Sequence, residues 1–180
     1  ADPAGEQSRR AKAVIERQTE QLTRLLDDLL DVTRIARGKV ELRRDRVDLA
    51  QLVRRAGEDH GGLMRERGIE MVVEVPSEPM WTEGDAVRLA QIVGNLLQNS
   101  AKFTSSGGHV TLALEAVRGA AEIHVRDTGT GMENDLLVHV FDPFVQAERT
   151  LARTSGGLGL GLALVKGLTE RHGGAGRAAS

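Results

Sequence analysis

The 180-residue sequence has no cysteine, no tyrosine, one tryptophan and only three phenylalanines. Without cysteine, a disulfide framework and a cysteine-based zinc site are excluded. No apolar run is long enough to span a membrane, and there is no signal-peptide pattern. The formal net charge of −2 gives no sign of a nucleic-acid-binding surface. We therefore expect a cytoplasmic fragment that contacts neither nucleic acid nor membrane, with a membrane anchor in its parent protein left open.

Apolar residues at alternating spacings of three and four predict one long helix over residues 8–37. The seam consists of Ile15, Gln18, Leu22, Leu25, Leu29, Val32 and Ala36. Leu26 and Leu30 widen it, which suits a multi-helix bundle. One helix cannot bury this face alone. The partner is another copy of the chain, a further helix or the globular part, and we expect a homodimer through this helix.

Residues 39–180 are expected to form one α+β domain, a two-layer α/β sandwich with helices on one face of a mixed sheet. Residues 1–7 begin like a vector remnant and are expected to be disordered, and residues 8–38 form the helical segment. The tail Ala175–Ser180 is a poor strand, which predicts a domain truncated at its C-terminus. Strands are predicted at 40–44, 69–75, 81–82, 110–117 and 121–127. Helices are predicted at 48–60, 85–102 and 159–171, and a lid without regular pattern at 133–156.

Asn95, Asn99 and Lys102 stand at i, i+4 and i+7 of a predicted helix, which places them on one face. Mg²⁺ takes few protein ligands when phosphates and waters complete its octahedron, so Asn99 with a nucleotide would meet its needs. Lys102 can neutralise phosphate as a point charge. The alternative is an ordinary solvated polar face.

Asp127 ends an alternating strand in which Ile123 and Val125 should face the core. It shares their side, so we expect it to be partly buried and to need a hydrogen-bond donor, which the adenine amine could supply. Gly129 and Gly131 would let the backbone approach the base. The alternative is a common Asp-x-Gly turn.

Gly157, Gly159 and Gly161 leave backbone N–H groups unobstructed where a helix begins, which favours anions. The run has neither the P-loop nor the Rossmann pattern, and the alternative is a flexible loop. The five histidines lack metal-ligand spacing, and surface positions are favoured for all of them.

In this order, the motifs closely resemble the ATP-binding catalytic domain of sensor histidine kinases. The wider group includes gyrase-, Hsp90- and MutL-type ATPases. Residues 91–104 resemble the N box, 127–132 the G1 box, 140–146 the F box and 157–166 the G2 box. The helix over 15–34 resembles the second helix of the dimerisation and phosphotransfer hairpin.

The resemblance implies ATP and Mg²⁺ as cofactors, with Asn99 coordinating Mg²⁺, Lys102 contacting phosphate and Asp127 reading adenine. Arg149, in the lid, is implied as a γ-phosphate contact and, with Asn99 and Lys102, as a catalytic residue. The residues expected to contact the nucleotide are Asn95, Asn99, Lys102, Phe103, Asp127, Gly129, Gly131, Met132, Phe144, Gly157, Leu158, Gly159, Leu160 and Gly161.

The resemblance also implies a reaction. The fragment would bind Mg-ATP and donate the γ-phosphoryl to a histidine on a helix outside this chain, for onward transfer to the receiver domain of a response regulator. Hydrolysing members of the group carry a glutamate where Asn95 stands, and an amide cannot act as general base on water. The alternatives are a non-catalytic nucleotide-binding and dimerisation module, an ATPase, and an anti-sigma-type serine kinase, against which the long helix speaks.

Overall fold

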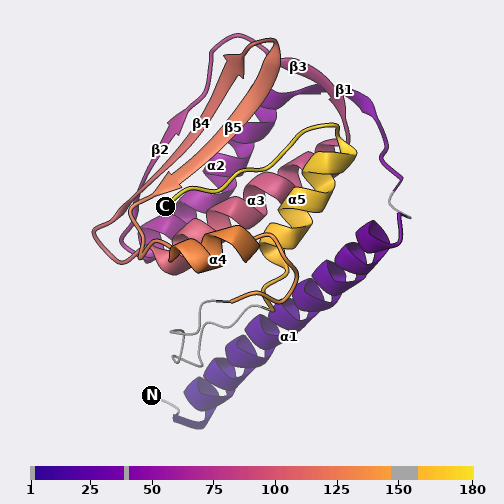
Figure 1. The fold of residues 1–180 in the computed structure, drawn as a ribbon. Coiled ribbons are helices and arrows are strands. Elements are labelled where there is room, and N and C mark those ends of the chain that lie inside the picture. Colours follow the sequence, from indigo (N-terminus) through magenta and orange to yellow (C-terminus); the bar gives the residue numbers. More distant parts are fainter. Residues whose placement is uncertain (1–2, 39–40, 147–157) are drawn as a thin grey trace.

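The computed structural model of the chain describes residues 3–38, 41–146 and 158–180 (Figure 1). A long helix precedes a domain in which strands lie on one side and helices on the other. The elements in chain order are α1 (Pro3–Ala36), β1 (Asp45–Asp48), α2 (Leu49–Glu66), β2 (Glu70–Glu74), β3 (Trp81–Gly84), α3 (Ala86–Phe103), β4 (His109–Val117), β5 (Ala120–Asp127), α4 (Asn134–His139) and α5 (Gly161–Arg171).

The long helix α1 is present and begins at Pro3, inside the segment expected to be disordered. Gly38 ends it with a left-handed φ of 68°, and the N–H of Gly38 donates to the carbonyl of Ile35. Figure 1 shows the N-terminal end of α1 extending beyond the globular part. Its C-terminal part packs on α5, where Ile35 lies against Gly167.

The main sheet is mixed, as predicted, with the order β2-β4-β5. β2 runs parallel to β4, and β4 runs antiparallel to β5. Arg118 and Gly119 both have positive φ, and they make the two-residue turn between β4 and β5. β1 and β3 form a separate antiparallel pair. The strand predicted at 40–44 was wrong, because β1 begins at Asp45 and Val47 is the residue that the core buries.

The core lies between the sheet and helices α2 and α3. Every second residue of β4 from Val110 to Leu114 is fully buried against these helices. A second apolar cluster, in which Ile92 of α3 meets Leu164 and Leu168 of α5, lies on another side of α3. α3 is thus packed both against the sheet and against α5, which restricts where its polar residues can point.

Asp85 caps α3 as predicted, with its carboxylate accepting the N–H groups of Val87 and Arg88. It also accepts the N–H of Arg43, in the segment that follows α1. Burial alone would raise the pKa of Asp85, but these three donors and the nearby charge of Arg88 together lower it. The cap therefore fixes the start of α3 and the connection from α1 at one carboxylate.

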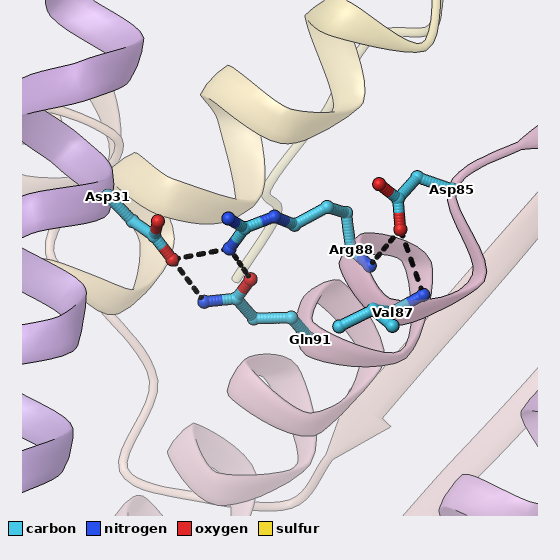
Figure 2. Close-up of polar contacts among 5 residues, drawn as sticks. All are labelled: Asp31, Asp85, Val87, Arg88 and Gln91. Carbon is cyan, nitrogen blue, oxygen red and sulfur yellow. Dashed lines mark hydrogen bonds and ion pairs between the residues drawn. The ribbon is translucent and has the colours of Figure 1, made fainter. Parts of the chain in front are cut away.

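A second polar contact joins α1 directly to α3 (Figure 2). The carboxylate of Asp31 is 7% exposed and accepts from Arg88 Nη1 at 2.5 Å and from Gln91 Nε2 at 3.0 Å. Arg88 also donates to Gln91 at 2.8 Å, so the three side chains close a triangle. A buried carboxylate is tolerated when it is paired and hydrogen-bonded in this way.

Candidate nucleotide-binding site

The site is built where the C-terminal end of α3 meets the N-terminal end of α5. The two helices run antiparallel, since Asp85 at the start of α3 contacts His172 at the end of α5. At their other ends, a Cβ built on Gly161 would lie 3.8 Å from Asn99 Nδ2. Asn99 of α3 therefore faces Gly161, the first residue of α5.

Asp127 lies at the same end of α3. Its Oδ2 accepts from Ser100 Oγ at 2.9 Å, and its Oδ1 accepts the N–H of Gly129 at 3.0 Å. Because Ser100 follows Asn99 directly, the acid and the amide lie close together at this end of α3. The expected partial burial of Asp127 was wrong: it is exposed, because it ends β5 beyond the last core-facing residue, Val125.

Gly129 is required by packing inside the protein. A Cβ there would lie 2.8 Å from the carbonyl oxygen of Phe103 and 2.7 Å from Asp127 Oδ1. The next residue, Thr130, donates its N–H to the same carbonyl of Phe103 at 3.2 Å. Gly131 has a positive φ of 67°, which favours glycine. This loop is therefore pressed against the end of α3, and Met132 follows with its N–H bonded to Ser180 Oγ.

Two side chains on α3 have the chemistry of phosphate partners. Burial lowers the pKa of Lys102, and its ammonium lies 4.7 Å from the centroid of the Phe103 ring. The amide nitrogen of Asn95 is buried and has no hydrogen-bond partner in the part of the chain that the structure describes. An unpaired buried donor costs about 1–3 kcal/mol, which an acceptor such as a phosphate oxygen would offset.

The start of α5 supplies backbone donors. Its N-cap residue, Leu160, is buried and has no polar side chain, so it caps none of the first-turn N–H groups. Gly159 has a φ of 72°, and a Cβ there would lie 2.7 Å from the carbonyl oxygen of Val145. Its carbonyl accepts the N–H of Phe144, so the F-box segment contacts the glycine run. Leu158, at 41% exposure, lies beside this contact.

The lid at 133–156 was predicted to lack regular structure, but its described part, residues 133–146, contains the short helix α4. Phe144, with a φ of 67° and 61% exposure, follows α4. Arg149 and Gly157 fall outside the described residues, so their roles stay predictions. Phe103, 39% exposed, presents an aromatic surface at the end of α3.

The surface position favoured for all five histidines was wrong for three of them, His60, His124 and His172, which are only partly exposed. His60 and His172 are half-buried, and each places Nδ1 2.8 Å from a carbonyl oxygen one turn back in its own helix. Ser100 was not singled out from the sequence as the partner of Asp127, since a small polar residue between the candidates Asn99 and Lys102 gives no separate signal. Among the described residues, no group of histidines and acids could hold a metal ion, and no helix is long and apolar enough to cross a membrane.

Comparison with known proteins agrees with this arrangement. Residues 84–180, over half of the chain, match the family model of histidine kinase-, DNA gyrase B- and HSP90-like ATPases. The sensor protein DivL of Caulobacter vibrioides is 36% identical over 97% of this chain and 22% of its own length. Hybrid signal transduction histidine kinase D of Dictyostelium discoideum is 34% identical over 89% of this chain and 11% of its own length. The chain thus spans less than a quarter of these two relatives.

Solved structures show the same fold. Full-length ShkA in complex with AMPPNP superposes with a TM-score of 0.72 at 31% identity, covering 90% of this chain and 33% of that one. The mycobacterial sensor histidine kinase MprB superposes with a TM-score of 0.60 at 32% identity, covering 72% of this chain and 80% of that one. With an acid, an amide helix and a glycine run at one end of the α3–α5 pair, this chain belongs to the family of histidine kinase-, DNA gyrase B- and HSP90-like ATPases, within its sensor histidine kinase branch.

Proposed function

We propose that the chain binds Mg-ATP and donates the γ-phosphoryl to a histidine on a separate helix, as the catalytic part of a two-component sensor kinase. The observation that carries the proposal is the Asp127–Ser100 bond, which places the acid next to Asn99 while Asn99 faces Gly161. A base-reading carboxylate and the phosphate-binding end of α5 thereby flank the same helix end.

In the proposed reaction, the protein's own residues bind the nucleotide and orient its phosphates. Asp127, with both oxygens fixed by Ser100 and Gly129, is set to accept from the adenine amine. Lys102 and the uncapped start of α5 would hold the phosphates. Asn99 would hold Mg²⁺, which supplies charge neutralisation at the phosphates.

Transfer to another nucleophile is favoured over hydrolysis by the chemistry of Asn95. The bond from the γ-phosphorus to the bridging oxygen breaks, a P–N bond forms to the acceptor imidazole, and ADP leaves. For hydrolysis, a base would have to take a proton from water, and the amide of Asn95 cannot do so. In the parent protein, the phosphoryl group would pass on to the receiver domain of a response regulator.

Calorimetric titration with ATP and Mg²⁺ tests the binding step. We expect Asp127→Ala to abolish measurable binding and Asn99→Ala to remove the dependence on Mg²⁺. Asp59→Ala, an exposed acid on α2, is the matched control and should bind like the wild type. Wild-type affinity in the Asp127 variant would refute the proposed adenine contact.

Radiolabelled ATP tests the transfer step. The chain alone should form no stable phosphohistidine, whereas an added helix with an acceptor histidine should become labelled. Binding without any transfer would indicate a non-catalytic nucleotide-binding module, and rapid steady-state hydrolysis would indicate an ATPase.

A further inference from the structure

Both ring nitrogens of His172 are engaged. Nδ1 lies 2.8 Å from the carbonyl oxygen of Leu168, and Nε2 lies 3.1 Å from the backbone nitrogen of Asp85. A carbonyl can only accept, so Nδ1 carries the proton. A backbone N–H can only donate, so Nε2 is unprotonated. The two partners together select the neutral Nδ1–H tautomer.

The imidazole ring of His172 is also closely packed against the backbone of Gly84. A Cβ built on Gly84 would lie 3.0 Å from His172 Cδ2 and 2.8 Å from Leu89 Cδ1. Gly84 is buried, and it immediately precedes Asp85. The chain therefore approaches the ring as closely as a residue without a side chain allows, which holds the acceptor nitrogen against the Asp85 N–H.

This bond lies at the opposite end of the helix pair from the nucleotide site. Asp85 and Asn99 are separated by 14 residues, or about 21 Å along α3 at 1.5 Å per residue. Apolar contacts between α3 and α5 hold the two helices together. The bond from the Asp85 backbone N–H to the His172 ring adds a directional constraint on their axial positions.

We propose that His172 is a positioning residue for the nucleotide site. Its bond to the Asp85 N–H sets the axial position of α3 against α5, and thereby the position of Asn99 relative to the backbone of Gly161. The inference rests on the proposed function, since it assigns a role in that site. We refer to His172, the Asp85 N–H and the Leu168 carbonyl together as the His172 clasp.

The connection from α1 is bonded to both sides of the His172 clasp. The Arg43 N–H donates to the Asp85 carboxylate, and the Arg44 guanidinium donates to the carbonyl of Arg171 at 2.9 Å. A displacement of this connection would therefore act on both bonds that flank the clasp, in addition to the direct contacts of α1 with α3 and α5.

Titration calorimetry with AMPPNP and Mg²⁺ on the full chain tests the positioning role. His172→Ala removes the acceptor and leaves the Asp85 N–H unpaired, so we expect affinity to fall on the order of tenfold. His172→Gln can place an amide oxygen near the position of Nε2 and should restore most of the affinity. His60→Ala is the control, because His60 makes the same bond to a carbonyl one turn back in a helix that packs on α3.

A long-range ¹H–¹⁵N spectrum of the wild-type ring nitrogens tests the clasp independently of nucleotide. We expect a neutral Nδ1–H tautomer, and an Nε2–H tautomer would overturn the proposal, even if His172→Ala fails to fold. A folded His172→Ala variant that binds AMPPNP as the wild type does would overturn the positioning role alone. A wild-type chain that binds no AMPPNP would instead overturn the proposed function.

Discussion

Ser100 is 3% exposed on α3, and its hydroxyl donates to the Asp127 carboxylate. A hydrogen bond to a charged group contributes about 1.5–3 kcal/mol, and more of it is lost when the acceptor is not rehydrated. Since Asp127 is exposed, water can replace the hydroxyl. We therefore expect Ser100→Ala to lower the free energy of unfolding by only about 1 kcal/mol.

Ser100→Ala should weaken nucleotide binding more than it weakens folding, because the Asp127 carboxylate loses one of the two hydrogen bonds that orient it. We expect adenine nucleotide affinity to fall on the order of tenfold in calorimetric titration, since about 1.4 kcal/mol corresponds to a factor of ten. Ser105→Ala, on the exposed loop after α3, is the control for both measurements. Undiminished affinity in Ser100→Ala would show that Gly129 alone is enough to orient Asp127.

Lys102 should take up a proton when nucleotide binds. Burial lowers the pKa of its ammonium, whose ordinary value is 10.5, and phosphate would raise that pKa again. In alkaline buffer, above the lowered pKa, a fraction of the free protein is neutral at this position and must be protonated on binding. Calorimetry in two buffers of different ionisation enthalpy measures the uptake, which Lys102→Met should abolish and the exposed Lys12→Met should not.

The lowered pKa of Lys102 also determines how the stability of the fold should change with pH. The unfolded chain holds the Lys102 proton up to a higher pH than the folded chain does. The contribution of Lys102 to stability should therefore rise with pH between its lowered pKa and 10.5, when unfolding is measured without nucleotide.

At the scale of elements, the triangle of Asp31, Arg88 and Gln91 holds the end of α1 on α3. Removing one partner of a buried ion pair costs about 3–5 kcal/mol, and the cost is smaller here because the Arg88 side chain is 25% exposed. We expect Asp31→Ala to loosen the last turns of α1 while the rest of the domain stays folded.

Hydrogen exchange resolved along the chain measures this loosening. Backbone amides in the last two turns of α1 should exchange at least tenfold faster in Asp31→Ala, whereas amides of β4 should be unchanged. Asp27→Ala, an exposed acid one turn earlier on α1, is the matched control. Equal protection of α1 in the wild type and Asp31→Ala would show that apolar packing alone holds the helix.

A helix could be predicted from sequence where a capping residue is followed by apolar residues at helical spacing. α3 has an aspartate cap at Asp85 followed by an apolar stripe, and its predicted and observed bounds agree within a residue. β1 has a single buried apolar residue, Val47, so the alternation just before it looked more like a strand. α4 is six residues long, has no side-chain cap bond to the described residues and buries none of its residues, so it offers no pattern.

The sequence predicts the residue types of the candidate site but not how they are arranged in space. Spacing on one helix brings Asn99 and Lys102 together without any knowledge of the fold. The bond between Ser100 and Asp127 depends instead on how β5 packs on α3, and the bond from Asp85 to His172 joins residues 87 positions apart. Such contacts follow from tertiary structure and leave no local signal.

At the scale of the whole molecule, α1 presents an uncovered apolar face. Ile15, Leu22, Leu26 and Leu30 are all more than half exposed. A contiguous apolar surface of this kind is typical of an association interface. We expect the chain to self-associate through α1, with a sedimentation coefficient that rises with concentration.

The double variant Leu22→Glu with Leu26→Glu should make the chain monomeric, because charges within the seam oppose its burial. Val138→Glu, at an apolar residue on α4 that is even more exposed, is the control and should leave association unchanged. A wild-type chain that stays monomeric at high concentration in light scattering would contradict the prediction.

The parallel pairing of β2 with β4 has a consequence for folding order. β3 and the whole of α3 lie between these two strands in the sequence, so no tight turn can bring them together. β2 and β4 can pair only once this crossover has formed, so α3 must be in place before the three-stranded sheet is complete. α1 lies outside this crossover, so its last turns can unfold without separating β2 from β4.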